Sequence, residues 1–396
     1  MEKERKLVNI ILYGACFFSC LSQLPIFVTG GMTQVVSFPL WIIAFLILFL
    51  KSGWKIDRSI IKLAVPSIIF VFLVLLASLL NNDFSYTSSS LFYSFLISVF
   101  IFFVGNMGGR YASDKVIEKI YFFYIAGTII VSFNVFVQYF GFGYDMTSRV
   151  YAYQSKNSFA QIVFTAIILL MVKFKPKRRI QAIFKWGLVA FEILLMVYLR
   201  SRATLVSFLV VIAILVLSKN TRKSLKMLVV ITCIALIFLM LSNDTLCDKI
   251  INNILFAGRD SSNLDDLTSG RVTILQNFPE LISGNWLFGI GSMYFECFYL
   301  SAILQFGLVA GIVLIIISLV PAYYGVVLSR TSENWYILML IAVGYLVDGI
   351  FEGITPFGAG IKCYFMWFLF GLLISRRNYI KYFGNSVNHK FGIKNR

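Results

Sequence analysis

The chain of 396 residues is 59% hydrophobic, carries charged side chains at only 13% of its positions, and has a mean hydropathy of +0.85. A soluble globular protein carries about 25% charged residues, so the composition excludes that class. The net charge of +17 does not indicate nucleic-acid binding, because the cations fall in short segments between apolar runs. Those runs are long enough to span a bilayer, so we expect an all-α, polytopic membrane protein.

The apolar runs predict about twelve spans in a single integral membrane domain, 1–396. They are 7–29, 33–50, 62–80, 90–108, 119–140, 158–173, 185–199, 203–218, 227–242, 297–327, 335–352 and 361–375. The first run lacks a small-residue cleavage site, so we expect it to remain as a span and not to be removed as a signal peptide. A large polar loop, 243–296, separates the ninth and tenth spans. Loops of that length in a compact protein are usually functional.

The distribution of lysine and arginine predicts the orientation. With the N-terminus inside, 27 of the 35 basic residues fall in cytoplasmic loops and tails, which leaves eight outside. The opposite orientation would reverse this bias and break the positive-inside rule. We therefore expect both termini in the cytoplasm and the 243–296 loop on the other side of the membrane.

Several cations lie on the predicted outer side, next to apolar spans. They are Arg149, Lys156, Arg200, Arg202, Arg259 and Arg271. Cations held there favour a polyanionic, membrane-anchored substrate, and a lipid diphosphate fits best.

The tight turn 199–203 carries the strongest local signal, because Arg200 and Arg202 flank a serine between two apolar runs. Arginine near the hydrocarbon is costly and often functional, and its planar fork binds phosphate oxygens in pairs. The amides at the start of the following helix would also point at an anion. The alternative is that both side chains only snorkel to lipid headgroups.

The entry to the sixth predicted span combines Tyr151, Tyr153, Lys156 and Asn157. Tyrosine can stack on sugar rings, lysine can bind phosphate, and asparagine can hydrogen-bond to hydroxyls. An aromatic belt followed by a helix cap explains the same residues without a ligand, so both interpretations stay open.

The long loop contains Arg271 and then Trp286, and it ends at Glu296 before the Tyr299 helix start. Two glycines, Gly289 and Gly291, predict a tight bend back to the membrane. Glu296 is either a favourable partner of the helix dipole or a carboxylate placed to act as a base.

Asp348 and Glu352 lie four residues apart, which predicts that they share one face of the eleventh helix. Lys362 opens the twelfth predicted span. A structural Glu352–Lys362 pair and a substrate contact are equally consistent with these positions, since membrane acids usually pair or line a cavity.

The sequence lacks an HExxH motif, a Walker motif and a zinc cluster, and its single histidine, His389, lies in the predicted cytoplasmic tail. These absences disfavour a histidine base or a tight metal site on the outer side. We expect no metal and no cofactor.

The order of these motifs resembles the O-antigen polymerase and O-antigen ligase superfamily of bacterial inner membranes. The resemblance covers roughly 149–311 and rests on five features: Lys156–Asn157, the 200–202 turn, Gly270–Arg271 in the large loop, 286–291, and the helix start 298–307. The ligase branch typically carries a histidine before that helix, where this chain has Glu296. This difference favours the polymerase branch.

The resemblance implies a GT-C-like architecture and a metal-independent enzyme at the periplasmic face. It would join undecaprenyl-diphosphate-linked oligosaccharide repeat units into O-antigen or a related surface polysaccharide. Membrane lipids, a chain-length regulator and a flippase are the expected partners, and nucleic acid is not.

On this interpretation Arg200, Arg202 and Arg271 bind the diphosphates, and Glu296 is the first choice of base, with Glu352 second. Three cations assist them: Arg149, Lys156 and Arg259. Asn157 is expected to contact substrate, and the residues expected to stack on sugars are Tyr151, Tyr153, Trp286 and Tyr299. The alternatives are an O-antigen ligase and a lipid-linked oligosaccharide flippase. A flippase would place charges through the middle of its spans, whereas these charges gather at one face.

Overall fold

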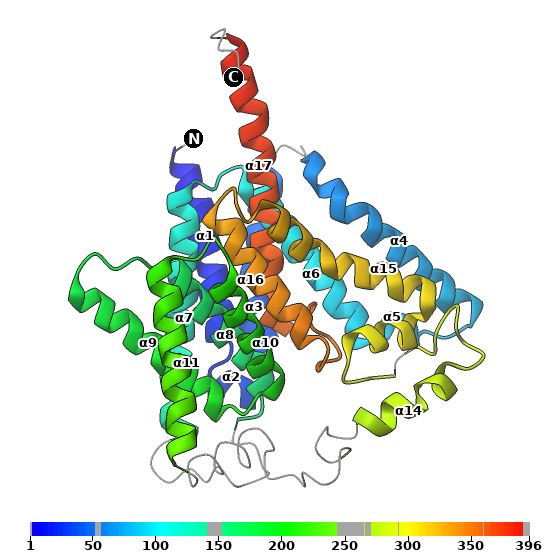
Figure 1. Cartoon of the computed structure of the whole chain (residues 1–396). Coiled ribbons are helices and arrows are strands. Elements are labelled where there is room, and N and C mark those ends of the chain that lie inside the picture. The colour runs from blue at the N-terminus through cyan, green and yellow to red at the C-terminus, as the bar shows by residue number, and fades with distance from the viewer. Residues whose placement is uncertain are drawn as a thin grey trace.

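The computed structural model describes residues 2–51, 57–140, 153–243, 265, 271–291, 293–358 and 360–390. Within these ranges the regular structure is helical and contains no strand. Figure 1 shows α1 beginning and α17 ending at one end of the bundle, which we call the terminal end, with α14 at the opposite end. We call that opposite end the α14 end.

The helices of the N-terminal half are α1 (Glu2–Leu21), α2 (Pro25–Thr29), α3 (Thr33–Lys51), the 3-10 helix η1 (Arg58–Ile60), α4 (Ile61–Leu80), α5 (Ser85–Ser88), α6 (Ser90–Gly109), α7 (Asp114–Tyr139) and α8 (Lys156–Val172). Those that follow are α9 (Arg179–Tyr198), α10 (Arg202–Leu217), α11 (Lys223–Ser242), α14 (Arg271–Ile282), α15 (Phe298–Leu328), α16 (Glu333–Asp348), the 3-10 helix η3 (Gly360–Cys363) and α17 (Tyr364–Lys390).

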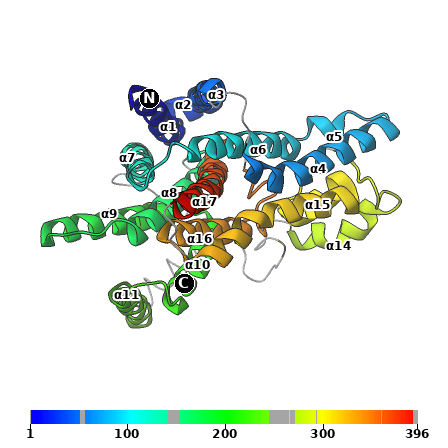
Figure 2. The same ribbon diagram turned by 90° about the horizontal axis from the view of Figure 1, so that it is seen from above.

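Among the described residues, six helices are long and apolar enough to cross a membrane: Thr33–Lys51, Arg58–Leu80, Ser90–Gly109, Asp114–Tyr139, Arg179–Tyr198 and Phe298–Leu328. Large apolar side chains on their outer faces are exposed, such as Phe72 on α4 and Ile180 on α9. Figure 2 shows α9 extending from one side of the bundle and α4 and α15 from the other. Apolar side chains exposed on long apolar helices are typical of lipid contact, so the fold is that of a helical membrane protein.

The first predicted span, 7–29, is not one continuous helix. α1 ends at Leu21, and the chain passes through 22–24 before α2 begins at Pro25. Proline cannot donate to the preceding turn and restricts the residue before it, which explains the break. The predicted spans 33–50 and 203–218 agree with α3 and α10 to within one residue.

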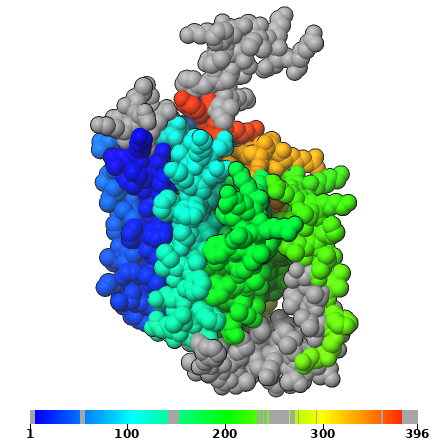
Figure 3. Space-filling view, turned by 90° about the vertical axis from the view of Figure 1, so that its left-hand side faces the viewer, coloured from blue at the N-terminus to red at the C-terminus, as the bar shows by residue number. Residues whose placement is uncertain are grey.

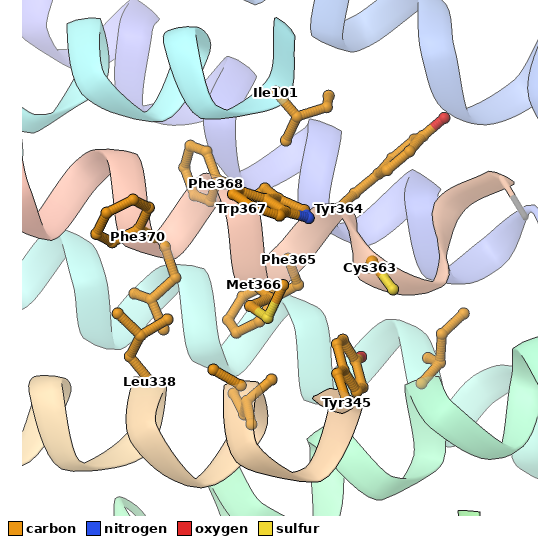
Figure 4. Close-up of a cluster of buried hydrophobic side chains, with 14 of the residues drawn as sticks. Ile101, Leu338, Tyr345, Cys363, Tyr364, Phe365, Met366, Trp367, Phe368 and Phe370 are labelled. Atoms are coloured by element: carbon orange, nitrogen blue, oxygen red, sulfur yellow. The ribbon is translucent and has the colours of Figure 1, made fainter. Parts of the chain in front are cut away.

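The packing of α6 against α17 forms the centre of the core. A Cβ on Gly105 or Gly109 would collide with the α17 backbone, and a Cβ on Gly371 would collide with α6. Small residues thus let the two helices approach closely, as is common between membrane helices. Figure 4 shows the adjoining α17 side chains, with Phe365 and Met366 lying toward Leu338 and Tyr345 of α16.

Candidate functional site

The last residue of α16 and the four residues after it contact several other helices at the α14 end. We call residues 348–352 the junction segment. Three neighbours donate hydrogen bonds to its side chains: Gln161 of α8 and Thr204 of α10 donate to Asp348, and Asn157 of α8 donates to Glu352. Two more contacts reach its backbone, from Arg271 of α14 to Phe351 O and from Phe298 N of α15 to Gly349 O. Four helices therefore converge on five consecutive residues.

The prediction that Asp348 and Glu352 share one helical face is wrong, because α16 ends at Asp348. Gly349 follows directly, and a Cβ there would lie 2.6 Å from Thr355 O, so the chain folds back on itself closely at this point. Glu352 lies in the returning segment, beyond the helix. The helical spacing rule does not apply across such a turn.

The turn between α9 and α10 has the predicted form. Leu199 caps α9, Arg200 adopts the left-handed conformation with φ of 53°, and α10 begins at Arg202. Arg200 is only 1% exposed. A residue other than glycine with positive φ is uncommon, and such strained residues cluster at functional sites.

The same turn connects to the junction segment through hydroxyl groups. Ser201 Oγ lies 3.0 Å from Thr204 Oγ1, and Thr204 Oγ1 donates to Asp348 Oδ1 over 3.3 Å. Gln161 Nε2 also donates to Thr355 Oγ1, at 3.2 Å. All these polar side chains are buried, so the turn is held by a polar network and not by apolar packing alone.

Asn157 and Tyr153, both predicted to contact substrate near the start of α8, have different surroundings in the structure. Asn157 Nδ2 donates to Glu352 Oε1 over 2.7 Å, which places it in the site. Tyr153 is 1% exposed, packs between Tyr139 and Phe159, and donates to Gln23 O over 2.6 Å. The prediction that Tyr153 stacks on a sugar is therefore wrong, because both its ring and its hydroxyl are engaged inside the protein. Lys156 is the first residue of α8 and lies next to Asn157.

Arg271, the first residue of α14, and Glu296, two residues before α15, form an ion pair. Arg271 Nη2 lies 2.8 Å from Glu296 Oε2 and donates to Phe351 O at the same distance. The guanidinium lies 5.9 Å from the Phe351 ring centroid. Arg271 Nε is buried and has no hydrogen-bond partner among the described residues. A buried N–H without a partner is uncommon in proteins and calls for an explanation.

The Glu296 segment packs directly on the Glu352 segment. A Cβ on Gly353 would collide with Phe295 O and lie 2.9 Å from the Tyr294 ring. Partial burial of its phenol, together with the nearby carboxylates of Glu352 and Glu296, raises the pKa of Tyr294 to about 12. Glu296 and Glu352 therefore both lie close enough to Tyr294 to affect its pKa.

Lys362 pairs with Glu352, which is one of the two arrangements that the sequence left open. Its Nζ lies 3.8 Å from Glu352 Oε2, and the side chain is only 2% exposed. Tyr345 OH donates to Lys362 O over 2.8 Å, which fixes η3 against α16. Lys362 thus adds a buried cation to the site.

The end of the long loop docks into a break in α15. Gly307 has a φ of 76° inside that helix, and Gly289 has a φ of 74° in the loop. A Cβ on either would collide with the other segment, because Ile290 N donates to Leu304 O and Leu308 N donates to Trp286 O. The predicted bend at Gly289 and Gly291 is confirmed by the positive φ of both residues.

The aromatic residues expected near the substrate have different surroundings. The Trp286 side chain is 48% exposed in the docked loop. Tyr299 is partly buried in the first turn of α15, where its hydroxyl donates to Leu346 O over 2.8 Å. Trp286 therefore keeps an accessible ring, whereas Tyr299 has its hydroxyl committed to α16.

Three predicted residues, Arg149, Tyr151 and Arg259, lie outside the described residues. Across the rest of the chain that the structure describes, no group of three or more histidine, cysteine, aspartate or glutamate side chains is arranged to hold a metal ion.

Two buried polar side chains that hydrogen-bond to acidic residues, Gln161 and Ser132, were not predicted from the sequence. Gln161 lies one turn after Asn157 on α8, so a polar stripe at that spacing was a usable signal. The partner of Glu192 is Ser132 of α7, whose hydroxyl donates to Glu192 Oε2 over 2.7 Å. No sequence spacing connects two residues on different helices in that way.

The site thus contains basic side chains and carboxylates from separate segments at one end of the bundle. No protein-family model matches this chain, and no curated protein is significantly similar to it.

Proposed function

We propose that this protein is a polysaccharide polymerase of the bacterial inner membrane. It would join undecaprenyl-diphosphate-linked oligosaccharide repeat units at the periplasmic face. The proposal includes about twelve spans in one GT-C-like membrane domain, both termini in the cytoplasm and the 243–296 loop in the periplasm. It rests on the resemblance in motif order and on the geometry of the α14 end.

One observation carries the proposal: segments far apart in the sequence converge on the junction segment. Arg271 and Asn157 both donate to it, and Arg271 also pairs with Glu296. The Arg200 turn reaches the same segment through Thr204 and Asp348. A diphosphate with a sugar attached needs cations and carboxylates within one small region, and this arrangement supplies both.

In the proposed reaction a hydroxyl of the acceptor sugar attacks the anomeric carbon of the donor chain. A new carbon–oxygen bond forms, and the bond from that carbon to the diphosphate oxygen breaks. The diphosphate leaves with the bonding electron pair, and a carboxylate takes the hydroxyl proton. Preorganised cations stabilise the charge that grows on the leaving group. We assign that role to Arg200, Arg202 and Arg271, with Lys156 assisting.

The geometry favours Glu352 over Glu296 as the base. Glu296 is engaged by a guanidinium at 2.8 Å, which leaves it less free to approach an acceptor hydroxyl. Glu352 has its cation at 3.8 Å and accepts its short hydrogen bond from the neutral amide of Asn157. Its side chain is 15% exposed, against 44% for Glu296, so bulk water competes less for it. Glu296 then serves to hold Arg271.

Sugar contacts are assigned to Trp286 and Tyr299, with Asn157 contacting substrate while it orients Glu352. The assignments of Arg149, Tyr151 and Arg259 rest on sequence alone. A chain-length regulator and a flippase remain the expected protein partners.

The test uses purified full-length protein with synthetic undecaprenyl-diphosphate-linked repeat units in proteoliposomes. The proposal predicts long polymer on the lipid carrier. Transfer of glycan to a lipid A core would indicate a ligase instead. Movement of the lipid-linked unit across the bilayer without any new linkage would indicate a flippase.

A further inference from the structure

A long groove lies at the terminal end, away from the proposed site. It has a volume of about 590 Å³ and runs between α7, α8 and α9. Figure 3 shows the face of the molecule on which α7, in cyan, lies beside α9, in green. The α7 wall extends from Glu118 to Ile129, which corresponds to about 16 Å of helix. Its other apolar walls come from α8 and α9.

One end of this groove is basic. Four lysines and two glutamates line it: Lys173, Lys175, Lys177, Lys185, Glu118 and Glu333. Both glutamates are paired, since Lys173 lies 3.2 Å from Glu118 and Lys175 lies 2.6 Å from Glu333. The groove therefore has an excess of two positive charges, and Arg222 lines an adjoining cavity of about 360 Å³ that shares Lys185 and Lys175.

Lys185 is a buried residue of the groove lining and not a surface lysine. It is 5% exposed, and its ammonium donates to Met171 O over 3.1 Å and to Phe174 O over 2.8 Å. An ammonium has three N–H donors, so one remains for an anion. No carboxylate lies within ion-pair distance of Lys185 or Lys177 in the described parts of the chain.

We propose that this groove binds an anionic phospholipid of the surrounding bilayer, with its phosphate on the lysines and an acyl chain between α7 and α9. A free phosphate ion would use the basic end but not the apolar walls. Phe122 and Phe184 on those walls are 62% and 64% exposed, which suits hydrocarbon contact. Basic pockets between membrane helices are suited to anionic headgroups. This site is separate from the proposed catalytic residues.

The test measures lipid binding to the full-length protein in detergent by native mass spectrometry. The probes are phosphatidylglycerol, phosphatidylcholine and inorganic phosphate. Wild-type protein is expected to retain phosphatidylglycerol about tenfold more tightly than phosphatidylcholine, and inorganic phosphate should not displace it. The double variant Lys175→Gln/Lys177→Gln should lose about tenfold in phosphatidylglycerol affinity.

The matched control is Lys115→Gln/Lys119→Gln, which removes the same charge from α7, where both lysines are exposed and line neither cavity. It should bind like wild type. Ala126→Trp fills the apolar wall and should also weaken binding. Equal binding by wild type and the groove double variant would overturn the proposal. So would displacement by inorganic phosphate, or a loss in the lysine variant with none in Ala126→Trp, because either result indicates a simple anion site.

Discussion

Arg271 and Glu296 are 25 residues apart in the sequence, and their side chains meet at 2.8 Å beside the Phe351 carbonyl. The pair holds the start of α14 and the end of the long loop beside the junction segment. Its side chains are 23% and 44% exposed, so it contributes about 0–1 kcal/mol to stability. The interaction stabilises little and leaves Arg271 Nε without a partner among the described residues, and the proposed function assigns it the positioning of a cation for the substrate.

Replacing Arg271 tests that role. Arg271→Ala is expected to lower the polymerisation rate by about 10²–10³-fold, because a charge that stabilises the leaving diphosphate is lost. Arg271→Lys should recover part of the rate, since lysine keeps the charge but not the planar fork. The measurement is polymer formed from lipid-linked units by purified protein.

Arg330→Ala is the control for this series, because it removes an exposed arginine at the terminal end. It should be fully active, and the thermal midpoint in detergent should be nearly unchanged in all three variants. A rate for Arg271→Ala within twofold of wild type would show that this cation does not stabilise the leaving group.

The two candidate bases are distinguished by amide substitutions. Glu352→Gln should abolish polymerisation, because the amide cannot take the acceptor proton. Glu296→Gln should retain measurable activity, since it still accepts a hydrogen bond from Arg271. Glu280→Gln, on the exposed face of α14, controls for loss of a carboxylate at this end. If Glu296→Gln were inactive and Glu352→Gln active, the assignment of the base would be reversed.

Two substitutions of Arg200 distinguish the effect of its left-handed backbone conformation from the effect of its charge. Arg200→Gly should fold about 1 kcal/mol more stably than Arg200→Ala, because glycine adopts a φ of 53° without strain. Both variants should nevertheless be inactive, since neither carries the guanidinium. Thermal melting in detergent and the polymerisation assay give the two readouts. Full activity in Arg200→Gly would leave Arg200 with a structural role only.

The docking of the loop on α15 depends on close backbone contact at Gly307. Gly307→Ala should destabilise the protein by about 2–4 kcal/mol and expose 283–291 to proteolysis, because its Cβ would collide with the Leu287 carbonyl. Gly284→Ala is the matched control, since Gly284 also has positive φ but open space around it. It should cost only about 1 kcal/mol. Equal effects of the two changes would mean that conformational strain alone, and not contact, matters at Gly307.

The helical fold and several local features could be predicted from the sequence, because they depend on the length of apolar runs and on residues close together in the chain. The bend at Gly289 and the turn at Arg200 follow from residues that are adjacent in the chain. The Glu352–Lys362 contact was also accessible, since a membrane carboxylate needs a nearby cation.

Other features depend on packing between segments far apart in the sequence. The end of α16 at Asp348 depends on contacts with Thr355 and Phe298, which no helical period encodes. Tyr153 is buried because Gln23 offers a carbonyl 130 residues away. An aromatic residue at a membrane interface has the same local sequence whether its ring faces a ligand or the core.

In the proposed reaction each new linkage releases one lipid diphosphate. The most direct measurement follows purified wild-type protein with synthetic undecaprenyl-diphosphate-linked repeat units and quantifies both free undecaprenyl diphosphate and glycosidic linkages over time. The proposed function predicts that the two increase in a one-to-one ratio, that both form about 10²–10³-fold more slowly in Arg271→Ala, and that both stop in Glu352→Gln. Unchanged donor with neither product, under conditions where the protein is folded, would contradict it.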